Sequence, residues 1–327
     1  MLSSIFLSLF MSFNLHAQST IKIDGSSTVF PITEAMAEEF QTSKKGAVRV
    51  TVGISGTGGG FKKFCRGETD VQDASRPISL SEMESCRKAG VKYVELPIAY
   101  DAIVVAVNLK NDWMTEAAVP DLKKMWSPEA QGKVTQWDQV NAQWPKEKLK
   151  LFGAGSDSGT FDFFTEAIVG KAKSSRGDYT ASEDDNTLVM GVANDRFALG
   201  YLPLAYYEAN KAKLRALPVK NAEASAKVKS VLPSRETVEN ATYYLARPIF
   251  IYVSEASLKK PEVREFTEFY LKNAAEIVPS VKYVALPAKA YTMSLEHAKK
   301  NRVGSIFGGK EPIGMKIEDL LKREASM

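Results

Sequence analysis

The chain has 327 residues, of which 44% are hydrophobic and 25% are charged, and its formal net charge is +4. This length predicts two domains rather than a single core. Lys and Arg are scattered along the sequence rather than gathered into one stretch, which argues against nucleic acid as a partner. The two histidines, His16 and His297, are too few to favour a zinc site or a Ser-His-Asp triad, so we expect no metal and no cofactor.

Residues 1–17 have the features of a signal peptide. Residues 5–15 are apolar, and Ala17 is a small residue suited to cleavage before Gln18. The segment carries no Lys or Arg, so a buried first helix or strand is the alternative interpretation. No later apolar run approaches the roughly 20 residues that span a bilayer. We therefore expect an exported, periplasmic protein.

Short β-branched runs alternate with amphipathic stretches, which is typical of an α/β fold. In chain order, the predicted strands are Ile21–Asp24, Val48–Ile54, Lys92–Leu96, Ile103–Val107, Lys150–Gly153, Leu199–Leu202 and Lys282–Leu286. The predicted helices are Pro31–Thr42, Gly60–Arg66, Ser81–Ala89, Phe161–Val169, Thr187–Asn194, Glu262–Lys272, Tyr291–Lys299 and Ile317–Arg323.

Two long extended runs, Tyr100–Asn108 and Tyr243–Val253, flank the middle of the chain. We interpret them as the two crossings between lobes. The first lobe would then combine residues 19–103 with residues 249–327, and the second lobe would comprise residues 104–248.

The sequence contains two cysteines, Cys65 and Cys86. In an oxidising compartment such a pair is more often bonded than free. We therefore predict a disulfide between them, with two buried thiols as the alternative.

Three predicted strands each run into a cluster of Gly, Ser and Thr that opens a helix. The first cluster is Asp24–Pro31 (DGSSTVFP), the second is Gly53–Lys62 (GISGTGGGFK) and the third is Gly153–Phe161 (GAGSDSGTF). A helix N-terminus presents unpaired N–H groups and a partial positive charge, which suits an anion. One such cluster is more often an ordinary helix cap. Three of them on converging strands favour a shared oxyanion.

None of the three clusters is an established nucleotide or catalytic motif. The sequence lacks the G-x-x-x-x-G-K-[ST] phosphate loop, and the second cluster lacks the third glycine of dinucleotide sites. The third cluster has Asp157, not serine, at the elbow position of a hydrolase. A fourth segment, residues 67–77, contributes Arg76, which by itself is more often a surface residue.

Four segments together, DGSSTVFPI, GISGTGGGFKKF, GETDVQDASRPIS and GSDSGTFDFF, resemble the substrate-binding protein of the high-affinity phosphate ABC importer. The resemblance covers nearly the whole chain after residue 17. It implies a type II periplasmic-binding-protein fold, with two mixed β-sheets flanked by helices and two hinge crossings between the lobes. It also implies inorganic phosphate as the ligand and the importer's membrane permease subunits as partners. We expect a monomer that is not an enzyme.

The resemblance further implies which residues contact the phosphate. These are Ser27, Thr28, Ser55, Thr57 and Gly58 in the first and second clusters, and Ser158, Gly159 and Thr160 in the third. Many relatives have Arg where this chain has Ala154 and Asp where it has Arg76. We interpret this as an exchange between lobes, in which Arg76 neutralises the ligand and Asp157 accepts a hydrogen bond from a protonated phosphate oxygen. Asn186 is a further candidate, although an acidic helix start is an equally good interpretation of its segment.

Two other functions remain open at this stage. One is a receptor for a different oxyanion, such as molybdate, tungstate or sulfate. The other is a secreted phosphatase that uses Ser158 or Thr160, although the sequence offers it neither a histidine base nor a metal cluster.

Overall fold

The computed structural model describes residues 18–221, 229–240, 242–309 and 317–325. The predicted signal peptide lies outside these residues. The strands are β1 Ser19–Gly25, β2 Val48–Ile54, β3 Val71–Ala74, β4 Tyr93–Asn108, β5 Ala117–Ala118, β6 Lys150–Ala154, β7 Thr180–Ser182, β8 Ala198–Pro203, β9 Leu214–Ala216, β10 Val219–Lys220, β11 Ala246–Ser254 and β12 Val284–Ala285. The α-helices are α1 Phe30–Ser43, α2 Gly56–Phe64, α3 Leu80–Lys88, α4 Val119–Trp126, α5 Gly159–Val169, α6 Asp185–Ala193, α7 Leu204–Asn210, α8 Arg235–Glu239, α9 Pro261–Ser280, α10 Ala288–Lys299 and α11 Ile317–Ala325.

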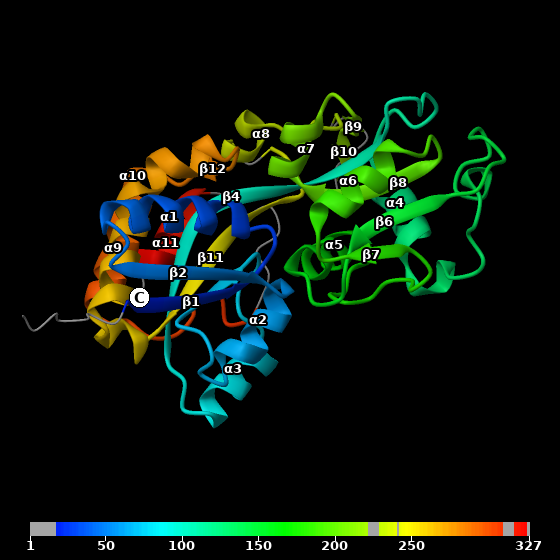
Figure 1. Ribbon diagram of the computed structural model, residues 1–327. Helices are drawn as coiled ribbons and strands as arrows, with labels where there is room; N and C mark the ends of the chain where they lie inside the picture. The colour runs from blue at the N-terminus through cyan, green and yellow to red at the C-terminus, as the bar shows by residue number, and fades with distance from the viewer. Residues whose placement is uncertain (1–17, 222–228, 241, 310–316, 326–327) are drawn as a thin grey trace, which may run out of the picture.

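A mixed β-sheet runs through the molecule in the order β2-β1-β3-β11-β4-β8-β6-β7 (Figure 1). β1 is parallel to β2 and β3, whereas β11 is antiparallel to both β3 and β4. At the other end, β6 is parallel to β7 and β8. The predicted α/β class is confirmed.

β4 connects the two halves of this sheet. Its first part, up to Ala102, pairs with β11 and β12, and from Ile103 onward it pairs with β8 and β9. The two mixed sheets that we expected are therefore continuous through one strand. All 16 residues of β4 and all 9 residues of β11 are buried, so these two strands form the centre of the core.

Helices cover the sheet on both sides. In Figure 1, α1, α9 and α10 lie above β1 and β2, and α2 and α3 lie below them. α1 buries Ile32, Met36 and Phe40, which lie on one face at helical spacing, and Phe40 packs edge-on against Phe266 of α9. Among the described residues, no helix is both long and apolar enough to cross a membrane.

The predicted disulfide is present between Cys65 and Cys86. Cys65 directly follows α2 and Cys86 lies in α3, and both residues are buried. The bond therefore fastens α3 to the helix that follows the second cluster.

Removing the disulfide by Cys65→Ser with Cys86→Ser is expected to lower the free energy of unfolding. The crosslink closes a loop with a sequence separation of 21 residues, and loss of that constraint on the unfolded chain amounts to about 3 kcal/mol. Urea unfolding of the variant and the parent measures the difference, with reduced parent protein as the control. An unchanged midpoint would show that the bond contributes nothing to stability.

Candidate functional site

The three Gly/Ser/Thr clusters meet where the N-termini of α2 and α5 approach each other. The Gly58 amide donates to the Asp157 carbonyl at 2.9 Å, which joins the second cluster to the third. The hydroxyl oxygens of Thr28 and Thr160 are 3.0 Å apart, which joins the first cluster to the third. The convergence that the sequence predicted is therefore present.

In the first cluster, Ser27 and Thr28 are buried at the start of α1. The Ser27 side chain faces Asp185 and partly offsets the effect of burial, which raises the pKa of that carboxyl group. The amide of Thr28 donates to Ser26 Oγ at 3.2 Å, and its hydroxyl faces Thr160.

The second cluster is held mainly by its own half of the molecule. Ser55 donates its hydroxyl hydrogen to Asp24, which also pairs with Lys63 at 2.6 Å. The Ser55 side chain therefore points toward Asp24 of β1. Thr57 Oγ1 accepts the amide of Ser75 at 3.1 Å and lies 3.2 Å from the Ser75 hydroxyl. The Thr57 side chain, unlike that of Ser55, also lies next to the third cluster, beside Gly159.

The third cluster forms the first turn of α5. Ser158 caps the helix, since its hydroxyl accepts the Thr160 amide at 3.1 Å. Gly159 packs closely against the other half of the molecule: a Cβ atom at this position would lie 2.5 Å from Ser75 Oγ and 2.7 Å from Thr57 Oγ1. Ser158, Gly159 and Thr160 are all buried.

Arg76 is only 3% exposed and already has two acidic partners. Its Nη atoms contact both carboxylate oxygens of Glu82, at 2.7 and 2.8 Å, and its Nε donates to Asp162 of α5 at 2.6 Å. Burial raises the pKa of Asp162, against the opposing charge of Arg76. Burial would also raise the pKa of Glu82, but the hydrogen bonds and charge of Arg76 outweigh it and lower this pKa.

Asp157 and Asn186 lie closer to solvent than the hydroxyl groups do. The Asp157 side chain is 42% exposed and pairs with Lys62 at 3.0 Å. Asn186 is exposed, and its backbone and side-chain amides both donate to Asp184, at 2.9 and 3.3 Å. At this helix start it is the neighbouring Asp185 that contacts the first cluster, through Ser27.

The sequence analysis missed three buried charged residues beside the clusters: Asp101, Asp185 and Arg247. Nη1 of Arg247 donates to the Gly159 carbonyl at 2.6 Å. Burial raises the pKa of Asp101 to about 6, although the charge of Arg247 opposes this, and burial raises the pKa of Asp185 to about 8. Two of the three could have been identified from the sequence, because Asp101 and Arg247 are each the single charged residue in an otherwise apolar run, 100–107 and 246–253.

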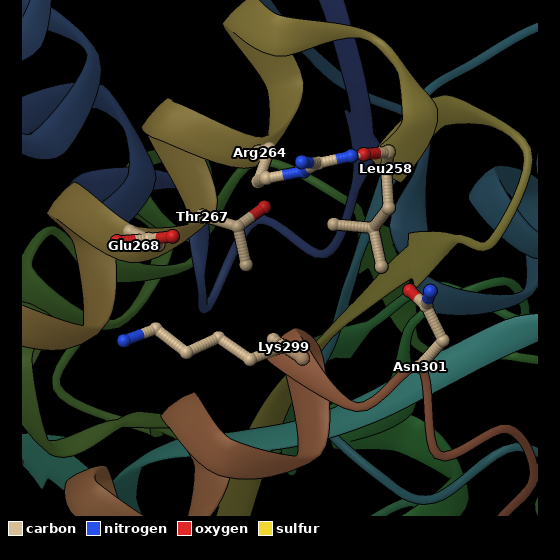
Figure 2. Close-up of a pocket in the computed structure, with 7 residues that line it drawn as sticks. Leu258, Arg264, Thr267, Glu268, Lys299 and Asn301 are labelled. Carbon is tan, nitrogen blue, oxygen red and sulfur yellow. The ribbon is translucent and has the colours of Figure 1, made fainter.

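A cavity of about 390 Å³ lies elsewhere, where α9 and α10 meet (Figure 2). Its lining consists of Leu258, Arg264, Thr267, Glu268, Ala298, Lys299 and Asn301. Glu268 is paired with Lys272 at 2.8 Å, and no residue of the three clusters takes part. Within the described part of the chain, no group of three or more His, Cys, Asp or Glu residues could hold a metal ion. The converging clusters therefore remain the best candidate site.

We compared the chain with a family model, with protein sequences and with solved structures. Residues 14–274 match the family model of the PBP superfamily domain. The sequence is 51% identical to protein SphX of Synechococcus elongatus, over 94% of this chain and 89% of that protein. It is 38% identical to the phosphate-binding protein PstS of Staphylococcus haemolyticus, over 85% of each. The fold resembles the crystal structure of a possible phosphate-binding protein from Planctomyces limnophilus, with a TM-score of 0.64 and 44% identity over 86% of this chain and 98% of that one.

Proposed function

This chain belongs to the PBP superfamily and, within it, to the family that includes protein SphX and the phosphate-binding protein PstS. On this basis we propose that it captures inorganic phosphate and delivers it to an ABC-type phosphate importer. The observation that carries this proposal is the convergence of three hydroxyl-rich clusters, each at a helix N-terminus, at one buried position. In this proposal the chain is a non-catalytic receptor that acts outside the cytoplasm and docks, as a monomer, on the importer's permease subunits.

The chemistry of the clusters suits a dehydrated phosphate. A buried anion is tolerated only when nearly all its oxygens accept hydrogen bonds, since each unmet bond costs roughly 1–3 kcal/mol. Hydroxyl groups and helix N-termini supply such donors without a metal. Thr28 and Thr57 supply them from one side, and Ser158, Gly159 and Thr160 from the other, with Ser27, Ser55 and Gly58 as the remaining candidates.

Arg76 remains the proposed cation that neutralises the ligand. Its guanidinium is buried and faces the third cluster's helix α5 through Asp162, while Glu82 holds it from its own half of the molecule. Asp157, which is partly exposed beside Lys62, remains the proposed acceptor of a hydrogen bond from the proton of hydrogen phosphate. Asn186 remains a candidate for a further ligand contact at the solvent-exposed edge of the site.

The proposed lobes are residues 19–103 with 249–327, and residues 104–248. The phosphate donors are divided between them, so that only the closed arrangement satisfies the anion fully. Ligand binding then stabilises closure, because the closed form has the higher affinity.

Titration calorimetry on phosphate-stripped protein tests the proposal. We expect one phosphate per chain and thermal stabilisation by phosphate, with weaker or absent responses to sulfate and molybdate titrated in parallel. A stronger response to one of those anions would reassign the ligand. Turnover of a chromogenic phosphate ester would favour a phosphatase, and the absence of both heat and stabilisation with phosphate would refute the proposal.

The variant Thr57→Val provides a local check, since it removes one hydroxyl and keeps the side-chain shape. It is expected to weaken phosphate binding about tenfold or more. Thr292→Val is the matched control, because the Thr292 hydroxyl bonds only to its own helix, at Ala288, on the exposed side of α10. Equal effects of the two substitutions would place the ligand away from Thr57.

A further inference from the structure

Arg247 lies outside all four segments that carry the family resemblance, yet it contacts the third cluster directly. It is the second residue of β11, directly opposite Asp101 of β4 in the antiparallel register, and only 1% of its surface is exposed. It therefore sits on the pair of strands that runs between the two halves of the sheet (Figure 1).

Its guanidinium is fixed on several sides. Nη1 donates to the Gly159 carbonyl at 2.6 Å, and Nη2 donates to Thr160 Oγ1 at 2.8 Å. Nη2 also lies 3.3 Å from Asp101 Oδ2, and the guanidinium carbon is 5.1 Å from the ring centroid of Phe163 in α5. The first turn of α5 is thus attached to the strand pair through one side chain.

These contacts determine which way the Thr160 hydroxyl points. An arginine donates hydrogen bonds and never accepts them, so Thr160 Oγ1 must accept from Arg247. The hydroxyl hydrogen of Thr160 is then directed away from the guanidinium, into the space it shares with the Thr28 hydroxyl, whose oxygen lies 3.0 Å away and which can act as either donor or acceptor. The same orientation suits an anion, because phosphate oxygens need donors.

We propose that Arg247 is a positioning residue for phosphate binding, which holds the Thr160 hydroxyl as a donor and fixes the third cluster to the strand pair. This inference rests on the proposed function, and it adds a residue that acts on the ligand through Thr160. Asp101 has a supporting role, because it orients the guanidinium and balances its charge.

A double-mutant cycle separates this role from a merely structural one. Because Arg247→Gln alone would leave the Asp101 carboxylate buried without its partner, the first variant combines Asp101→Asn with Arg247→Gln. The second variant is Thr160→Val, and the third carries all three substitutions. Phosphate affinity is measured for each by calorimetry, after thermal unfolding has verified that it is folded.

Each of the first two variants is expected to bind phosphate between about tenfold and a hundredfold more weakly than the parent. The triple variant is expected to bind no more weakly than the weaker of the two, because both changes remove the same donor. Losses that multiply in the triple variant would overturn the inference, as would full affinity in Asp101→Asn/Arg247→Gln. Failure of the parent to bind phosphate would instead overturn the proposed function.

Two further variants keep the test decisive. Arg247→Lys retains the charge but cannot donate to Gly159 and Thr160 in the same fork geometry, so it should also lose affinity, and full affinity in this variant would count against the inference. Arg176→Gln with Asp178→Asn removes another buried arginine and its partner carboxylate. Arg176 donates to the carbonyls of Met125 and Val134, and Asp178 accepts the Gly132 amide, so neither contacts the clusters. This control is expected to keep the parent's affinity, and an equal loss here would mark the effect as general destabilisation.

Discussion

Replacing Gly159 by alanine is expected to weaken phosphate binding at least about a hundredfold, which corresponds to roughly 2.7 kcal/mol. The added methyl group would lie 2.5 Å from Ser75 Oγ and 2.7 Å from Thr57 Oγ1, far inside van der Waals contact. Both partners are fully buried and come from the opposite side of the site, so the clusters would have to separate. Donors that are held apart cannot satisfy one small anion together.

Calorimetry with phosphate measures this effect, and Gly177→Ala is the control. Gly177 has only Gln131 Oε1 near the position of a new methyl group, at 3.5 Å, which is an ordinary contact. The control should therefore bind as the parent does. If Gly159→Ala bound phosphate with the parent's affinity, the closed packing of the third cluster against Thr57 and Ser75 would not be the binding form.

Replacing Arg76 by alanine is expected to lower the free energy of unfolding by about 3–5 kcal/mol, because it leaves buried carboxylates without their cation. Glu82 and Asp162 both pair with this one guanidinium at 2.6–2.7 Å, and the other cation near Asp162, the exposed Lys173, is 3.9 Å away. Asp162 belongs to α5, in the other half of the site. The substitution therefore also removes a connection between the fourth segment and α5.

Urea unfolding measures the loss of stability. Arg87→Ala is the control, since Arg87 is exposed and its pair with Glu84 has a separation of 4.0 Å; it should not change the midpoint measurably. Adding Glu82→Gln and Asp162→Asn to Arg76→Ala should recover part of the stability. A variant as stable as the parent would contradict the view that these carboxylates depend on Arg76.

The sequence predicted strands well where the side chains alternate or are uniformly apolar. The bounds of β2, Val48–Ile54, agree with the prediction. β3 was not predicted, because its residues Gln72 and Asp73 are polar although both are fully buried. Gln72 donates to the Thr57 carbonyl at 3.0 Å, and Asp73 accepts from Thr33 at 3.0 Å. A local pattern cannot show that such groups will find partners inside the fold.

The single strand β4 corresponds to two predicted strands, Lys92–Leu96 and Ile103–Val107, and Pro97 follows the first of them directly. In the structure the register with β11 shifts beside Pro97, between Ile249 and Phe250. The irregularity accommodates a residue that has no amide hydrogen, and the strand continues.

The candidate site was likewise predictable only in part. The three clusters were predictable because each is a contiguous segment with its own helix start. The partners of Arg76 and Arg247 were not, because Asp162 and Asp101 are 86 and 146 residues away from them in the sequence. Asp185 and Asn186 differ for a simpler reason: consecutive helical residues point about 100° apart, so only one of them faces the first cluster.

The position of β11 has a consequence for how the chain reaches its native state. β1, β2, β3 and β4 all precede residue 109, but the place between β3 and β4 is filled only by residues 246–254. A chain that emerges N-terminus first must therefore wait for about three quarters of its length before its central sheet can be completed. Such long-range pairing slows folding and delays commitment to a compact state. A protein that crosses a membrane as an extended thread benefits from this delay, because an early, stable core would obstruct the translocation channel.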